Sequence, residues 1–278
     1  MEPVGATNQA GMEAVSDELD YWPVDYIQTA IKKSGYEPVN PLAALQDGAP
    51  VEFFVSGASN LYNDLNDSIV GTVYKIVKAD GSDVTDDDVQ TAPVNNIAHS
   101  MWANMDFELN GVTVSQAGQH YPYRAYLETL LSYQSNSLDN RHIIEGWDKD
   151  DTGEMEEFDA TKNDGFKRRR DAHNKSTHVV VYFRPRLDIF HQPRLIPANI
   201  NMKLRLIPAK SKFALVQKNG VADHKLKIVD CKFWVLRKLI APEMFLAHTK
   251  MREKKNMRIP YTKVQTKHLT LVRGQMIQ

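Results

Sequence analysis

The segment HKLKIVDCKFWVLRKL (224–239) decides the fold, because its apolar side chains recur at every second position. One face is wholly apolar and consists of Val229, Cys231, Phe233 and Val235. The other face mixes polar with apolar residues. Such alternation predicts a β-strand with one buried side, as in an antiparallel sheet. The segment NMKLRLI (201–207) alternates in the same way, with one apolar and one basic face.

Further strand-like segments lie on both sides. Asn110-Gly111, between apolar residues in DFELNGVTVS (106–115), is the strongest hairpin signal in the chain. Other runs of β-branched and aromatic residues cover 51–57, 70–81, 178–190, 199–207 and 258–272. Short loop helices are expected over 95–105, 122–133 and 242–253. Since strands do not alternate with long helices, we predict an all-β, antiparallel jelly-roll sandwich of about eight strands.

Two polar regions lie outside the predicted strands. Residues 1–48 contain four prolines and many acidic groups, which predicts an extended N-terminal arm before a jelly-roll domain over 49–278. The arm carries many apolar residues for a solvated tail. We therefore expect it to dock on this domain or on a neighbouring subunit through Tyr21, Trp22 and Tyr26. A second polar stretch, 134–177, predicts a long surface insertion within the domain.

The charges are divided along the chain. The formal net charge is −1, but residues 1–165 hold 29 acidic and 8 basic side chains, and residues 166–278 hold 6 acidic and 26 basic. We expect acidic loops of one subunit to face basic strands of the next, in contacts that weaken as salt rises. The basic run Lys167, Arg168, Arg169 and Arg170 suggests an electrostatic contact with nucleic acid. Basic side chains that keep strands soluble are the simpler explanation.

No enzyme motif accompanies these strands. The chain has no GxSxG, GxGxxG or P-loop sequence, and its nine histidines lack zinc-binding spacing. We therefore expect no catalytic residues and no cofactor. The single cysteine, Cys231, excludes an intrachain disulfide, favours a reducing compartment and lies on a predicted buried face. No run of about 18 apolar residues and no basic leader occurs, so neither a membrane span nor conventional secretion is expected.

One acidic loop partly matches a calcium-binding motif. In DKDDTGEMEEFD (148–159), oxygen-bearing side chains occupy alternate positions and Gly153 stands at position 6. The last position is Asp159, one methylene shorter than the glutamate that binds bidentately. A solvated loop is the simpler interpretation. Calcium binding is the alternative, with the ligands Asp148, Asp150, Thr152, Glu154, Glu156 and Asp159.

Longer segments resemble one protein family. APVNNIAHSMWANMDFELNGVTVS (92–115), YPYRAYLETLLSY (121–133) and RLDIFHQPRLIPANINMKLRLI (186–207) are similar to the major capsid proteins of polinton (Maverick) elements and related adinto-like viruses. The resemblance implies a double jelly roll that forms trimeric capsomers of a double-stranded DNA virus. Residues 49–278 have room for one jelly roll. The chain is thus expected to be the first half of a split or truncated capsid protein, or a lineage that works as a single jelly roll.

The resemblance implies a structural role and not an enzyme. It implies a virion shell protein, made in the host cytoplasm or nucleus, that contacts copies of itself, other capsid proteins and packaged DNA. Residue types enriched at interface hot spots occur in the signature at Tyr121, Tyr123, Arg124 and Tyr126. A helix packed over one end of the sandwich is the alternative for these four. For the whole chain, the alternative is a jelly-roll module that binds glycans or nucleic acid, as a domesticated or truncated remnant.

Overall fold

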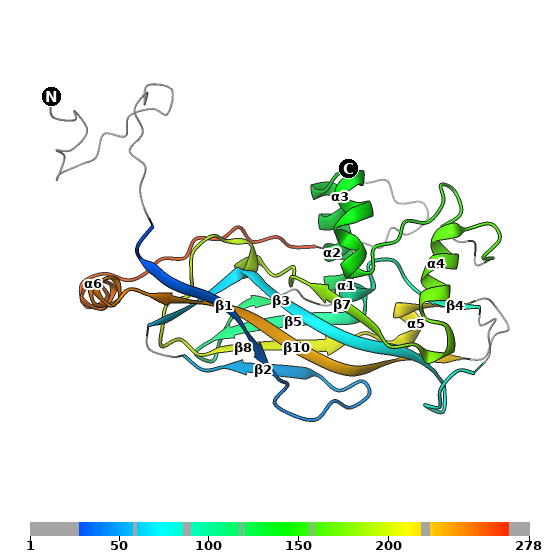
Figure 1. The fold of residues 1–278 in the computed structure, drawn as a ribbon, viewed down its shortest axis with the longest axis horizontal. Helices are drawn as coiled ribbons and strands as arrows, with labels where there is room; N and C mark the ends of the chain where they lie inside the picture. Colours follow the sequence, from blue (N-terminus) through cyan, green and yellow to red (C-terminus); the bar gives the residue numbers. More distant parts are fainter. Residues whose placement is uncertain are drawn as a thin grey trace, which may run out of the picture.

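The fold is a sandwich of two four-stranded antiparallel sheets (Figure 1). In the computed structural model, the residues described are 28–57, 60–85, 90–116, 118, 120–155, 157, 159–217 and 223–266. One sheet has the order β1 (Ile31–Val39), β10 (His224–Ile240), β3 (Leu61–Lys78) and β7 (Val179–Phe183). The other has the order β2 (Val51–Val55), β8 (Met202–Pro208), β5 (Trp102–Leu109) and β6 (Val112–Gln116). A short separate pair consists of β4 (Thr91–Pro93) and β9 (Leu215–Gln217).

Most strands that are neighbours in the sheets are distant in sequence, and the β5–β6 hairpin at Asn110-Gly111 is the exception. β1 pairs with β10 and β2 pairs with β8, so the first strands of the domain lie beside the last. Each sheet combines strands from the first and the second half of the chain, as the two Greek keys of a jelly roll require. The predicted antiparallel jelly roll of eight strands is confirmed.

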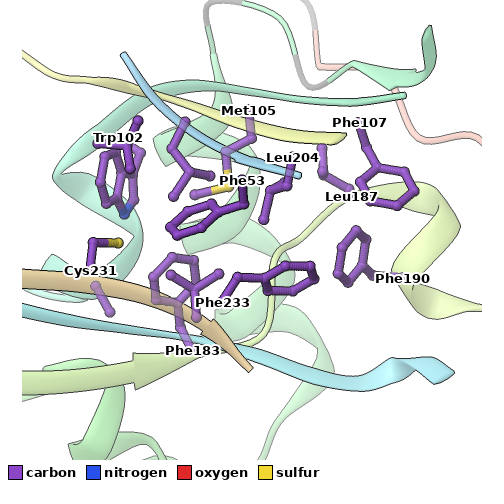
Figure 2. Packing of buried hydrophobic residues seen from close by; sticks show 14 of the residues in the cluster. Phe53, Trp102, Met105, Phe107, Phe183, Leu187, Phe190, Leu204, Cys231 and Phe233 are labelled. Carbon is purple, nitrogen blue, oxygen red and sulfur yellow. The ribbon is translucent and has the colours of Figure 1, made fainter. Parts of the chain in front are cut away.

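The core lies between the two sheets (Figure 2). Phe53 from β2 and Phe233 from β10 meet with their ring centroids 6.0 Å apart. Phe107 from β5 meets Phe190 edge to face at 5.1 Å. All four rings are fully buried. Burial of one such side chain contributes about 1.5–3 kcal/mol, so these contacts hold the sheets together.

The alternation of β10 breaks at one point. Cys231 and Phe233 are buried as predicted, but Val229 is 41% exposed. The reason is a β-bulge, because the pairing with β3 shifts register between Ile228 and Asp230. One extra residue turns the side chains before it to the other face. Burial raises the pKa of the Cys231 thiol to about 12, so this cysteine is a packing residue and not a nucleophile.

The first strand lies where the sequence predicted an arm. Residues 31–39 form β1, an edge strand, so the sandwich begins at residue 31 and not at residue 49. Its side chains show no alternation, since seven of its nine residues are exposed. Pro38 in β1 also argues against a strand, but an edge strand tolerates proline. The strand predicted over 258–272 is wrong for 258–266, which form neither helix nor strand.

Short helices occupy the loops, and each of the three predicted regions contains one. They are α1 (Ile97–Ser100), α2 (Tyr121–Ser132), α3 (Ser135–Asn140), α4 (Asp164–Ala172), α5 (Ser211–Ala214) and α6 (Pro242–Arg252). The 3₁₀ turns are η2 (His142–Glu145), η3 (Asn174–Ser176) and η4 (Asp188–His191). The insertion over 134–177 holds helices and turns and, in its described residues, no strand. The helices α1 to α4 gather at one end of the sandwich and α6 lies at the other (Figure 1).

The segment after α6 runs back along the sandwich toward α2 (Figure 1). The hydroxyl of Tyr261 donates to the carbonyl oxygen of Val114 in β6 at 2.9 Å. The N–H of Val264 donates to Oδ1 of Asp188 at 3.1 Å. These bonds link the α6 end of the domain to its helical end. In the part of the chain that the structure describes, no helix has the length and apolar character needed to cross a membrane.

Candidate subunit interface

Helix α2 presents an apolar stripe to the outside. Five buried residues form its packed side: Tyr121, Pro122, Arg124, Ala125 and Thr129. Four exposed residues form its outward side, which we call the α2 stripe: Tyr123, Leu127, Leu130 and Leu131. Leu131 is 81% exposed. A surface helix ordinarily has one apolar side, which faces the core. Helix α2 has two, because Tyr121 and Ala125 pack in the core and the α2 stripe faces outward.

The four interface residues predicted on α2 differ in their exposure to solvent. Tyr121 is fully buried and Arg124 is 3% exposed, so the prediction that they contact another subunit is wrong for a folded chain. Tyr126 is half-buried and stacks on Trp147, with the ring centroids 5.2 Å apart. Of the four, Tyr123 alone is exposed. The arm residues Tyr21, Trp22 and Tyr26 lie outside the described residues, and their role stays a prediction.

Arg124 is held beneath α2 by two carboxylates. Its Nη2 lies 2.6 Å from Oδ1 of Asp188, and its Nε lies 2.7 Å from Oε1 of Glu128. Its Nη1 donates to the carbonyl oxygen of Val264 at 3.2 Å. The side chains of Arg124 and Asp188 are almost completely buried, so water and salt screen their attraction little. The pair ties α2 to η4 and to the C-terminal segment.

A second buried chain of hydrogen bonds joins α1 to α2 and η2. The hydroxyl of Tyr121 accepts from the backbone N–H of Arg186 at 3.3 Å and lies 2.8 Å from Nδ1 of His99. Nε2 of His99 faces Oε2 of Glu145 at 3.5 Å, and a carboxylate favours the tautomer with the proton on Nε2. In that tautomer the Tyr121 hydroxyl donates to Nδ1. The same carboxylate oxygen lies 2.9 Å from Nδ1 of His142.

This tyrosine, histidine and glutamate are sealed from solvent. Tyr121 and His99 are fully buried, and Glu145 is buried as well. Burial lowers the pKa of His99, which favours a neutral ring. Burial by itself raises the pKa of Glu145, but the hydrogen bonds from His142 and His99 outweigh it and hold that pKa well below its usual range. Because a substrate cannot reach these groups in the folded chain, they serve to fix the helices in place.

Sequence reasoning missed the residues that support α2 from below. Arg186 donates to the hydroxyl of Tyr133 at 3.3 Å and to Oγ1 of Thr129 at 3.4 Å. Its guanidinium also lies 5.3 Å from the centre of the Tyr133 ring. Arg186 and Asp188 are single charged residues between strands and helices, without any motif spacing. Only the folded chain brings them under α2.

Acidification should weaken the contribution of Glu145 to stability. Its pKa is lowered in the folded state, so the carboxylate stabilises the fold above the usual pKa of about 4.3, and this stability is lost as pH falls further. We expect Glu145→Gln to cost about 2 kcal/mol at neutral pH and much less near pH ~3, measured by urea unfolding. The control Glu157→Gln, whose partner Lys162 is exposed, should match the wild type in both conditions. An equal cost of Glu145→Gln in both conditions would contradict this account.

The predicted basic patch on α4 contains an internal clamp. Arg169 has a side chain only 8% exposed, and its Nη2 lies 2.7 Å from Oδ1 of Asp150. It also donates to the carbonyl oxygens of Asp148 at 2.6 Å and of Pro93 at 3.0 Å. Arg169 therefore does not belong to a surface patch. The rest of the run lies at or near the surface and consists of Lys167, Arg168 and Arg170.

Arg169→Lys should show whether the hydrogen bonds of Arg169 or its positive charge stabilise the fold. Lysine keeps the positive charge but lacks the planar fork that spans three acceptors, so we expect the free energy of unfolding to fall by about 2 kcal/mol. Arg168→Lys is the matched control, because the side chain of Arg168 is 56% exposed in its pair with Asp148. Its expected change is below about 0.5 kcal/mol. Equal changes in chemical denaturation would show that Arg169 does not clamp the loop.

The carboxylates of the predicted calcium loop turn toward α4. Asp148 and Asp150 pair with arginines of that helix. Asn163, the N-cap of α4, donates from Nδ2 to Oδ1 of Asp150 at 3.1 Å. Among the described residues, no three acidic, histidine or cysteine side chains are grouped so as to hold a metal ion, and Glu156 lies outside them. Calcium binding stays a prediction, which calorimetric titration with calcium tests.

Comparison with known proteins relates this fold to viral structures. No family model matches the chain. A chain in the structure of the Sputnik virophage matches with a TM-score of 0.53 and 10% identity, over 85% of this chain and 53% of that one. This match supports the jelly-roll fold. The mavirus major capsid protein matches this jelly roll with a TM-score of 0.40 and 15% identity, over 85% of this chain and 54% of its own.

A sequence relative of this chain comes from an animal. The uncharacterized protein F54H12.2 of Caenorhabditis elegans is 28% identical over 210 residues, which are 73% of this chain and 48% of that protein. The chain therefore spans about half the length of the proteins that it matches. The match to the Sputnik chain bears on the fold alone. The function has to be argued from the residues of the jelly roll itself.

Proposed function

We propose that this chain is a structural protein of a viral capsid shell and that it assembles with copies of itself through the α2 stripe. The observation that carries the proposal is the exposed apolar α2 stripe. Buried bonds from Arg124 and Tyr121 hold the packed side of the helix inward. The helix therefore cannot rotate to bury the stripe within its own domain, and a partner surface is the way to cover it.

The composition of the α2 stripe suits a subunit interface. Its three leucines would each contribute about 1.5–3 kcal/mol on full burial, against the entropic cost of association. Tyr123 adds a rigid aromatic side chain, a type common at the centre of interfaces. The stripe carries no charge, so its burial leaves no ionised group without a partner.

The jelly-roll fold supports the same role, since it matches a chain in the Sputnik virophage structure. The finer proposal rests on the resemblance to polinton (Maverick) major capsid proteins, whose signature includes the α2 segment YPYRAYLETLLSY. In this proposal three copies form a capsomer, and capsomers join one another and other capsid proteins in the virion of a double-stranded DNA virus. The exposed cations of the second half would then contact packaged DNA.

Size-exclusion chromatography with light scattering, followed by electron microscopy, tests the proposal. We expect oligomers, trimers among them, that persist when salt is raised, because the α2 stripe is apolar. A strict monomer at all protein and salt concentrations would exclude a shell protein. A salt-sensitive shift with DNA, or binding to a glycan array, without self-assembly would favour the alternative of a jelly-roll binding module.

A further inference from the structure

A groove opens at the α6 end of the sandwich, opposite α2. It has a volume of about 1020 Å³ and lies between α6 and the ends of β1, β3 and β10. Its floor is apolar, since Tyr62 and Ile240 are buried there and Leu195 packs against them. The hydroxyl of Tyr62 lies 2.8 Å from Nδ1 of His248, which holds α6 over the floor. We call this cavity the α6 groove.

Helix α6 leaves the groove incompletely covered. None of its residues is buried. Met244 and Met251 line the groove and are 40% and 51% exposed. Methionine side chains adapt their shape to a partner, so this wall can accept an apolar segment. An open apolar groove of this size indicates an occupant.

The rim of the α6 groove is basic. The described residues that line it include no carboxylate and four cations: Arg194, Arg252, Lys255 and Arg258. All four are exposed, and none forms an ion pair with a carboxylate in the described part of the chain. Charge complementarity therefore selects an occupant that is acidic as well as apolar.

We propose that the occupant is the chain's own N-terminal arm. The segment DELDYWPVDYI (17–27) has four acidic groups, no basic group and three aromatic side chains among its apolar residues. Its four carboxylates equal the cations of the rim in number and are opposite to them in charge. Its aromatic rings suit the apolar floor. The arm also enters the domain at this point, since Ala30 and Ile31 line the groove.

This point of attachment favours docking within one chain. Three residues separate Ile27 from Ile31 in the groove wall, and the eleven residues of the segment can extend over about 35 Å. So short a tether gives an effective concentration in the millimolar range, above that of any neighbouring arm in dilute protein. The proposal concerns the single chain and does not depend on a role in a shell.

Fluorescence of Trp22 in the full-length chain tests the proposal. The difference between the wild type and Trp22→Phe isolates the emission of this residue, which we expect to be blue-shifted and protected from acrylamide. Arg252→Glu combined with Arg258→Glu should lower the ratio of docked to free arm about tenfold and expose Trp22 to the quencher. The matched control Lys250→Glu reverses an exposed charge of α6 that does not line the groove, and it should change nothing.

Each outcome decides the proposal. Quenching of Trp22 in the wild type at the rate of a free tryptophan derivative overturns it. Protection that grows with protein concentration overturns docking within one chain and assigns the arm to a neighbouring copy. Protection that survives Arg252→Glu and Arg258→Glu, at an unchanged thermal midpoint, excludes the α6 groove as the site. The changed side chains are all exposed, so the variants should fold as the wild type does.

Discussion

Asp188→Asn is expected to lower the free energy of unfolding by about 3–5 kcal/mol, the cost of leaving one charge of a buried pair without its partner. The Oδ1 of Asp188 lies 2.6 Å from Nη2 of Arg124 and accepts from the N–H of Val264 at 3.1 Å. Asparagine keeps the shape of the side chain but removes its negative charge. Among carboxylates, Arg124 then keeps Glu128, which is partly exposed. Urea unfolding followed by circular dichroism measures the loss.

Two further variants show whether the loss of stability comes from the unpaired charge of Arg124 or from lost packing. Glu128→Gln removes the more exposed partner of Arg124 and should cost about 1 kcal/mol or less. The double variant Arg124→Met, Asp188→Leu removes both charges. It should regain most of the stability, because apolar side chains of similar volume often replace a buried ion pair without loss. If Asp188→Asn costs no more than Glu128→Gln, the buried pair does not hold the helical end in place.

Leu127→Glu combined with Leu131→Glu should abolish self-association and leave the domain folded. Both side chains are exposed in the single chain, so their replacement changes the free energy of unfolding little. In an assembled interface, each glutamate would bury a carboxylate among apolar groups. The association constant should therefore fall by at least about 100-fold. Light scattering over a dilution series measures it.

The matched control for this variant is Leu246→Glu on α6. Leu246 is similarly exposed, and α6 lies at the other end of the sandwich (Figure 1). This control should assemble as the wild type does. Assembly of the double α2 variant at wild-type concentrations would exclude the α2 stripe as the interface, whatever the control does.

The division of charge along the sequence is partly paired within the chain. Lys238 of β10 lies 2.6 Å from Asp64 of β3, and Arg237 lies 3.0 Å from Glu37 of β1. The jelly-roll winding places early strands beside late ones, so the acidic half meets the basic half inside each subunit. The salt-sensitive contacts predicted between subunits must therefore compete with internal pairs. Assembly through the uncharged α2 stripe is accordingly expected to resist salt.

The sequence predicted the helix of the candidate interface but not which of its sides faces outward. The apolar spacing of residues 122–133 predicted a helix correctly, because residues three and four apart share a face. The spacing does not tell which face is inward. That depends on Asp188, which is 64 residues from Arg124 in sequence and reaches it only through the fold. Arg124 therefore appeared as an interface residue, although its charge is satisfied internally.

The sequence by itself determined the all-β class, most strand positions and the places of the loop helices, because alternation and turn residues act over a few neighbouring positions. Only the tertiary structure decided that residues 31–39 form a strand, that a bulge exposes Val229, and that α2 buries Arg124 while its leucines face outward. Each of these depends on contacts between distant segments: β10 alongside β1, β3 alongside β10, and buried charges beneath α2. Their free energies arise only once the sandwich has closed.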